Sequence, residues 1–282
     1  MHKSLNGIVV VCCIVWTGTH GECQMITAHR GASYDAPENT MAAFRLAWEQ
    51  NADAIEGDFR LTKDRRIVCV HDANTQRTCG VNRDISSATL EELQDLDFGR
   101  WKDPSFQGER CCTLDDVLLS VPAGKKIYIE LKSGVEIIEP LAWVVEKSPT
   151  PQSALIVIAF DEHVVTACKE RLPGIKVHWL TDFKRGKPDG HVWRPTALEI
   201  AAVVNRCKAD GVGLKGRRDI LNKDFVQQLF DGGVQEFHVW TVDAPVDARF
   251  FANLGAIGIT TNRPALIRSA FPSKRGTISK DR

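Results

Sequence analysis

Short apolar runs alternate with longer amphipathic stretches along most of the chain. The runs predict strands over Met25–His29, Ala54–Arg60, Ile67–His71, Lys126–Lys132, Ala154–Phe160, Ile175–Leu180, Gly211–Leu214, Glu236–Val242 and Ala256–Thr260. The stretches predict helices near Thr40–Gln50, Glu136–Glu146, Glu162–Arg171, Thr196–Lys208, Lys223–Phe230 and Val246–Leu254. Eight strand-then-helix units in about 250 residues favour a single α/β domain, a (β/α)8 TIM barrel. A doubly wound open sheet is the alternative, but it usually has fewer strands and often a glycine-rich first turn, and the sequence has no GxGxxG.

The barrel is expected over residues 23–270, with one insertion and two dissimilar ends. The stretch from about 73 to 124 is too long for a simple strand-to-helix connection and contains one helical pattern, Thr89–Leu96, so we expect a small insertion near the barrel mouth. Residues 271–282 are polar and basic and are predicted to be a disordered tail.

Residues 1–22 resemble an export signal. Lys3 precedes the apolar run Ile8–Trp16, and small residues follow it. The run is shorter than the roughly 20 residues of a membrane span, so we expect a periplasmic or secreted mature chain without a stable span. An uncleaved anchor or a wrongly chosen start codon are the alternatives.

Composition excludes several classes of protein. Hydrophobic residues make up 43% and charged residues 26% of the 282 positions, which argues against a wholly disordered chain and against a polytopic membrane protein. Lys plus Arg and Asp plus Glu are each 36, so no basic field favours a nucleic-acid partner. Nine cysteines lack the spacing of a zinc site or of a disulfide framework, although one bridge among Cys79, Cys111 and Cys112 is conceivable.

Three acidic side chains are predicted to converge inside the barrel. Because side chains alternate along a strand, Glu56 and Asp58 share the inner face of one strand, and Glu130 lies on the inner face of another with Lys132. Unpaired carboxylates in a barrel interior repel one another, and a divalent cation would relieve that repulsion. The alternative is a purely structural network in which Arg30 and Lys132 neutralise the acids.

Two histidines stand where strands end. His29 follows the first strand beside Arg30, and His71 ends the Ile67–Val70 run, which suits proton transfer at the barrel mouth. Arginine suits phosphate because its fork can bind two oxygens. His238 is expected in the core, and Trp240 is either a substrate wall or a plug.

These pieces together resemble the glycerophosphodiester phosphodiesterase family. The matching motifs are His29-Arg30-Gly31, Pro37-Glu38-Asn39-Thr40, Glu56-x-Asp58, His71-Asp72, Glu130-x-Lys132, Trp240-Thr241-Val242 and Gly258-Ile259-Thr260-Thr261-Asn262-x-Pro264. They occur in the family's order over residues 25–268. Each motif alone is weakly specific, whereas the ordered set is highly specific.

The resemblance implies a (β/α)8 barrel that hydrolyses glycerophosphodiesters, small-molecule substrates, to sn-glycerol 3-phosphate and an alcohol. It implies His29 and His71 as acid–base catalysts, and Glu56, Asp58 and Glu130 as ligands of a divalent metal, Mg2+ or Ca2+. Arg30 and Lys132 would contact the phosphate, and we assign Trp240 to the substrate site with them.

Departures from the family pattern leave substrate preference open. Asn262 replaces the usual acidic residue of the last motif, Ala159-Phe160 stands where Ser-Phe is common, and Cys112 replaces a proline before Thr-Leu. Two alternatives therefore stand beside the main hypothesis: phospholipase D-type release of head groups from lysophospholipids or sphingolipids, and a binding module that has lost turnover.

Overall fold

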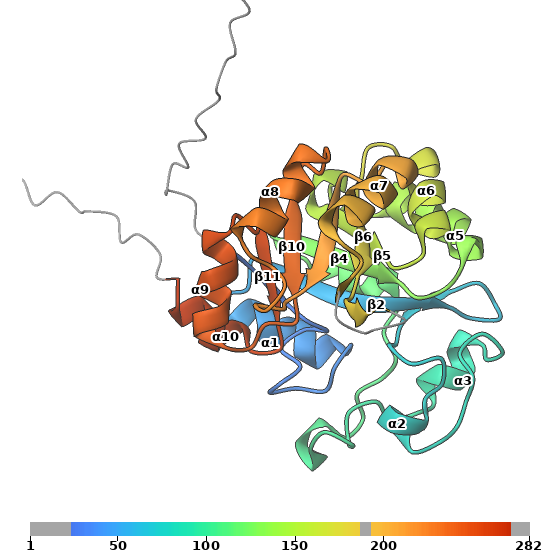
Figure 1. Cartoon of the computed structure of the whole chain (residues 1–282). Helices are drawn as coiled ribbons and strands as arrows, with labels where there is room; N and C mark the ends of the chain where they lie inside the picture. The colour runs from blue at the N-terminus through green and yellow to red at the C-terminus, as the bar shows by residue number, and fades with distance from the viewer. Residues whose placement is uncertain (1–23, 187–192, 272–282) are drawn as a thin grey trace, which may run out of the picture.

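The computed structural model describes residues 24–186 and 193–271, and within them eight parallel strands close into a barrel (Figure 1). The strands are β1 (Met25–Ala28), β2 (Ala54–Leu61), β4 (Lys126–Leu131), β5 (Leu155–Ala159), β6 (Lys176–Thr181), β9 (Gly211–Lys215), β10 (Phe237–Trp240) and β11 (Gly258–Thr261). Their order around the barrel is β1-β2-β4-β5-β6-β9-β10-β11, and β11 pairs with β1 to close it. The predicted (β/α)8 barrel is therefore confirmed.

Helices form the outer layer. They are α1 (Met41–Glu49), α4 (Leu114–Leu119), α5 (Ile138–Lys147), α6 (Glu162–Arg171), α7 (Ala197–Cys207), α8 (Lys223–Asp231), α9 (Pro245–Asn253) and α10 (Pro264–Ser269). Thr40 begins α1 because its side chain accepts a hydrogen bond from the backbone of Ala43, which satisfies a donor that the first turn leaves free. Short 3₁₀ turns, Val135–Ile137 and Gln152–Ala154, precede α5 and β5.

The core has two layers. Outward residues of the strands, such as Ile55 and Phe59 of β2, are fully buried against the helices. A smaller apolar cluster that includes Tyr128, Ile156 and Leu180 fills the barrel interior. Burial on both faces explains why these strands appear in the sequence as nearly continuous apolar runs.

The insertion begins earlier and ends earlier than the 73–124 stretch suggested. It starts with β3 (Ile67–Cys69), which pairs antiparallel with β2, and continues through α2 (Gln76–Cys79), α3 (Leu90–Gln94) and the 3₁₀ turn Pro104–Phe106. The α2–α3 part lies beside the end of β2 and has a small core of its own (Figure 1). By contrast, α4 packs into the main core through Leu114, Val117 and Leu118, so it is the barrel helix that precedes β4. Periodicity missed it because it has fewer than two turns.

A two-stranded ribbon, β7 (Lys184–Arg185) with β8 (Trp193–Arg194), extends the loop after β6. The predicted signal (1–22) and nearly all of the predicted tail (271–282) lie outside the described residues. Within the described part of the chain, no helix is long and apolar enough to cross a membrane. The six cysteines of that part are free thiols, and Cys69 is buried as expected.

Candidate active site

Three buried carboxylates meet inside the barrel where β2 and β4 end. Glu56 and Asp58 project from β2 and Glu130 from β4, with Asp58 directly opposite Glu130 in the strand register. One oxygen of each side chain lies within 4.8 Å of the others. Glu130 is 7% exposed, and the other two residues are less exposed, so water screens their repulsion poorly.

Burial and the neighbouring charges shift the pKa values of the three acids in different directions. Burial, together with the charges of Asp58 and Glu130, raises the pKa of Glu56 well above its usual range. Burial and Asp58 raise the pKa of Glu130 to about 7. Burial acts in the same direction on Asp58, but Lys132 and Arg30 outweigh it and hold the pKa of that carboxyl below its usual range. The cluster therefore favours protonation of one member unless another cation is bound.

Arg30 and Lys132 both contact the acids. Lys132 Nζ lies 3.1 Å from Asp58 Oδ1 and also contacts Glu130 Oε1, while Arg30 Nε lies 3.1 Å from Asp58 Oδ2. Arg30 and Lys132 thus neutralise part of the acidic charge, as in the purely structural alternative. Two cations face three carboxylates, however, and Arg30 shares its charge with Glu38, which lies 2.9 Å away.

The acids fit a hard divalent cation. Glu56 Oε1 is buried and accepts no hydrogen bond from the described residues, and Asp58 Oδ1 and Glu130 Oε1 both contact Lys132 Nζ. One oxygen of each carboxylate can reach a common ion. Asn39 fixes Asp58 from behind, since its side-chain amide donates to Asp58 Oδ2 over 2.9 Å and accepts from the Asp58 backbone over 3.1 Å. An oxygen-only set of this kind matches the preference of Mg2+ or Ca2+.

His29 lies at the rim because the chain turns sharply after β1. Arg30 has a φ of 55° and Gly31 a φ of 79°, and a Cβ on Gly31 would lie 2.6 Å from the backbone of Ala43. This tight turn places His29 Nε2 4.0 Å from Glu56 Oε2 and His29 Nδ1 2.7 Å from Asn262 Oδ1. Burial and the neighbouring Arg30 charge lower the pKa of His29 to about 4, so the ring is neutral at pH 7.

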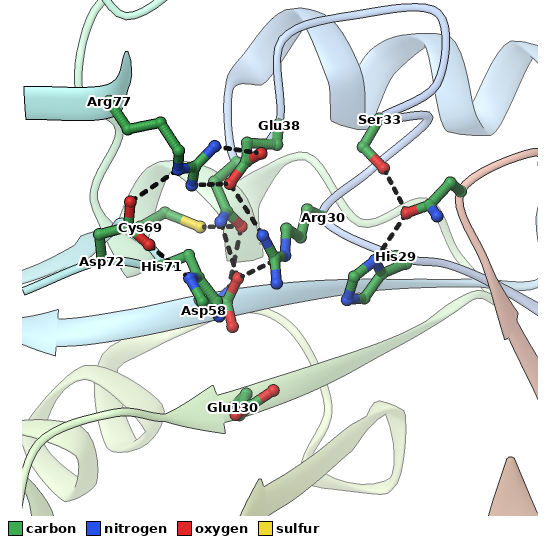
Figure 2. Close-up of polar contacts among 12 residues, drawn as sticks. His29, Arg30, Ser33, Glu38, Asp58, Cys69, His71, Asp72, Arg77 and Glu130 are labelled. Atoms are coloured by element: carbon green, nitrogen blue, oxygen red, sulfur yellow. Dashed lines mark hydrogen bonds and ion pairs between the residues drawn. The ribbon is translucent and has the colours of Figure 1, made fainter. Parts of the chain in front are cut away.

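His71 reaches the same mouth from the insertion. Its backbone carbonyl accepts from Arg60, and its Nδ1 lies 2.7 Å from Asp72 Oδ1. Figure 2 shows His71 beside Asp58, and a chain of ion pairs continues from Asp72 through Arg77 and Glu38 to Arg30. The contact with Asp72 therefore orients the His71 ring through its Nδ1 atom.

Aromatic rings line the other side of the mouth. The rings of Phe160 and Trp240 meet edge to face with centroids 5.5 Å apart, and Lys132 Nζ lies 5.8 Å from the Phe160 centroid. Lys215 Nζ lies 4.7 Å from the Trp240 centroid. Trp240 also packs against the interior cluster of the barrel, as a plug would, and its place in the substrate site stays a prediction. His238 is 1% exposed, which agrees with the expected place in the core.

The sequence did not predict a role for several polar residues of the site. Glu38 and Asn39 stood in a matched motif, and Asn262 stood out as a departure, but the pattern did not indicate their partners. Arg77 and Asp243 gave no signal, because their contacts cross 39 and 19 positions of the chain.

Comparison with known proteins identifies the family of the chain. The family model described as "Glycerophosphoryl diester phosphodiesterase family" matches residues 29–266. The Bacillus subtilis protein named "Putative glycerophosphodiester phosphodiesterase YhdW" is 37% identical over 245 residues, which cover 86% of this chain and 96% of that protein. A glycerophosphodiester phosphodiesterase of Caldanaerobacter subterraneus subsp. tengcongensis is 31% identical, over 85% and 94% of the two chains.

Solved structures share the fold. A phosphodiesterase from Oleispira antarctica, in complex with the product sn-glycerol-3-phosphate, superposes with a TM-score of 0.77 at 24% identity and covers 88% of this chain and 96% of its own. The extent of the family match and the 37% identity together decide the assignment. The chain belongs to the glycerophosphoryl diester phosphodiesterase family and is an enzyme of that family.

Proposed function

We propose that the protein hydrolyses glycerophosphodiesters to sn-glycerol 3-phosphate and an alcohol in a reaction that needs a divalent cation and two histidines. The observation that carries the proposal is the convergence of three buried carboxylates with His29 and His71 at one mouth of the barrel. The substrate class is supported by the names of the relatives and by the product bound in the Oleispira antarctica structure.

Glu56, Asp58 and Glu130 would hold the cation. A bound divalent cation neutralises charge on the phosphoryl oxygens. Lys132 and Arg30 add donors from the protein: in the described part of the chain, Arg30 Nη2 has no partner, while Nε and Nη1 face Asp58 and Glu38. A phosphoryl oxygen beside Arg30 could therefore accept its N–H without displacing either carboxylate.

The partners of the two histidines favour different roles. His29 is neutral and faces the amide oxygen of Asn262, so its Nε2 can accept a proton from the attacking hydroxyl, either of water or of the substrate itself. His71 Nδ1 is held by the carboxylate of Asp72, which orients the ring to donate a proton to the leaving alkoxide. We assign His29 as the base and His71 as the acid.

The metal requirement is tested by exhaustive chelation followed by addition of Mg2+, Ca2+ or Mn2+. We expect turnover of glycerophosphocholine to fall by about three orders of magnitude, since a metal supplies several kcal/mol to such a transition state. Glu56→Gln should lower turnover as chelation does. Glu139→Gln should not, because Glu139 of α5 is exposed and pairs with Arg171 of α6. Full activity in protein shown to be metal-free by elemental analysis would contradict the proposal.

The histidine assignment is tested with two leaving groups. His29→Ala and His71→Ala should each lower kcat by about 10²–10⁴-fold on a natural diester. With a p-nitrophenyl ester, whose leaving group needs no protonation, His71→Ala should recover and His29→Ala should not. His163→Ala, on the exposed face of α6, is the matched control. The same panel should include lysophospholipids, because preferential turnover of these would favour head-group release instead.

A further inference from the structure

The ends of three neighbouring strands carry a hydrogen-bonded chain of side chains that leads to His29. Asp243 follows β10, Asn262 follows β11, and His29 follows β1, and these strands adjoin in the barrel. Ala28 pairs with Thr261 in the register, so His29 and Asn262 emerge side by side. Figure 2 shows His29 and Ser33 directed at one amide oxygen.

Asp243 fixes the orientation of the Asn262 amide. Asp243 Oδ2 accepts from Asn262 Nδ2 over 2.6 Å, while Asp243 Oδ1 accepts from the Asn262 backbone over 2.8 Å and from the Thr261 hydroxyl over 2.9 Å. An ionised carboxylate can only accept, so the NH2 end of Asn262 must face Asp243. The amide oxygen must then face the opposite way.

That oxygen determines which nitrogen of His29 carries the proton. Asn262 Oδ1 lies 2.7 Å from His29 Nδ1 and also accepts from Ser33 Oγ over 2.9 Å. Because an amide oxygen cannot donate, Nδ1 must be the protonated nitrogen of the neutral ring. Nε2 is then an acceptor, and it is the nitrogen that lies toward Glu56 and the acidic cluster.

We infer that Asp243 and Asn262 are positioning residues that hold His29 in its Nδ1–H tautomer, so that Nε2 can accept the proton of the attacking hydroxyl. The catalytic consequence rests on the proposed function, whereas the tautomer itself does not. An amide suits position 262 because an aspartate there would place a second carboxylate about as close to Asp243 as the 2.6 Å hydrogen bond that it replaces.

The tautomer is measured directly by ¹⁵N NMR of the histidine-labelled enzyme at neutral pH. The His29 signals are identified by their loss in His29→Asn. We expect a protonated Nδ1 and an unprotonated Nε2. A wild-type spectrum with the proton on Nε2 would overturn the inference, whether or not the protein hydrolyses any diester.

Asp243→Asn reverses the donors and acceptors in the hydrogen-bonded chain Asp243–Asn262–His29 and keeps the size and shape of the side chain. The new amide keeps its oxygen toward the Asn262 backbone and the Thr261 hydroxyl, so its NH2 group meets the NH2 group of Asn262 and forces that side chain to flip. Asn262 then donates to His29 Nδ1 and moves the proton to Nε2. We expect the NMR signature to invert and kcat to fall by about 10²–10⁴-fold with KM little changed.

The double variant Asp243→Asn with Asn262→Asp provides the rescue. The amide introduced at position 243 can donate to the carboxylate introduced at position 262, which accepts again from His29 Nδ1, so the Nδ1–H signature and most of kcat should return. Asp247→Asn, which removes a carboxylate on α9 that pairs with Arg218, should change neither. If Asp243 and Asn262 only stabilised the loops, the Nδ1–H signature and kcat would not be lost in the single variant and restored in the double variant.

Two outcomes would refute the positioning role. One is an inverted spectrum with unchanged kcat, and the other is a double variant no better than the single one. If Asp243→Asn does not fold, the wild-type and double-variant spectra still decide.

Discussion

Buried polar clusters occupy both ends of the barrel, and they differ in how well their members satisfy one another. At the carboxyl ends of the strands, Glu56, Asp58 and Glu130 face two cations and leave Glu56 Oε1 without a hydrogen bond from the described residues. At the amino ends, His178 and His238 stack, with 3.1 Å between their Nδ1 atoms.

The amino-end cluster is nearly closed on itself. His178 Nε2 lies 2.9 Å from Glu236 Oε1, and Lys176 Nζ pairs with Glu236 over 2.7 Å. The ring of Tyr128 lies 5.0 Å from that of His238, although the Tyr128 hydroxyl is buried without a hydrogen bond from the described residues. One proton between the two imidazoles satisfies both Nδ1 atoms, so these histidines need no ligand.

Residue type alone therefore does not distinguish a site from a core. Histidines and carboxylates occur at both ends, and what differs is the excess of like charge at the mouth. Unrelieved repulsion among buried groups costs stability, so its persistence marks the place where a ligand is expected. Substitutions at the two ends should therefore have opposite effects on stability and activity.

The largest expected effect is the loss of turnover in Glu56→Gln at the mouth, which also changes stability. In the metal-free protein, its raised pKa means that the folded state binds more protons than the unfolded state above about pH 4.5, so Glu56 lowers stability as pH rises. The glutamine keeps an acceptor for the Arg30 N–H and removes that cost. We expect urea melts at pH 7 to show a gain of about 1–2 kcal/mol while turnover is lost. A loss of stability would show that the acids are structural.

The next effect concerns the amino end. His178→Ala leaves Glu236 and His238 without their shared partner and opens a cavity in the barrel. We expect the free energy of unfolding to fall by about 2–4 kcal/mol, with unchanged kcat in the folded fraction. Equilibrium melts and active-site-normalised assays measure the two quantities, and His163→Ala serves as control. A large drop in kcat would contradict the prediction, because it would show that the amino-end cluster also affects catalysis.

The smallest effect is a slope of stability with pH. Burial and the neighbouring His178 lower the pKa of His238 well below 6.5, so below that pH the unfolded chain takes up a proton that the folded chain refuses. Stability due to this group is full above pH 6.5 and falls by up to about 1.4 kcal/mol per unit as pH decreases. The slope measures the number of protons taken up on unfolding. In melts between pH 6.5 and 5.5, His238→Gln should lower that number by up to one, and His29→Asn should lower it by up to one more. An unchanged slope in both variants would contradict neutral burial of these rings.

Much of the fold followed from local pattern. Buried parallel strands are short apolar runs, and α6 matches the predicted range Glu162–Arg171 because its turns and its N-cap, Asp161, are local features. The short α4 and α10 escaped notice because fewer than two turns give no periodic signal. The extent of the insertion also escaped, because only packing shows that α4 belongs to the main core.

The inner face of the site was likewise fixed by alternation along single strands. The sequence by itself determined that Glu56 and Asp58 share a face, that Glu130 and Lys132 share another, and that His29 and His71 follow strands, since each statement depends on neighbours in the chain.

Tertiary structure alone decided which partner each group meets. That Asn262 faces His29 across 233 positions, that Asp72 faces His71, and that Lys132 stands between two acids depend on strand order, register and side-chain conformation. Proton positions and charge balance in this protein are set by contacts of a few ångströms between distant segments, and no local pattern in the sequence encodes such distances.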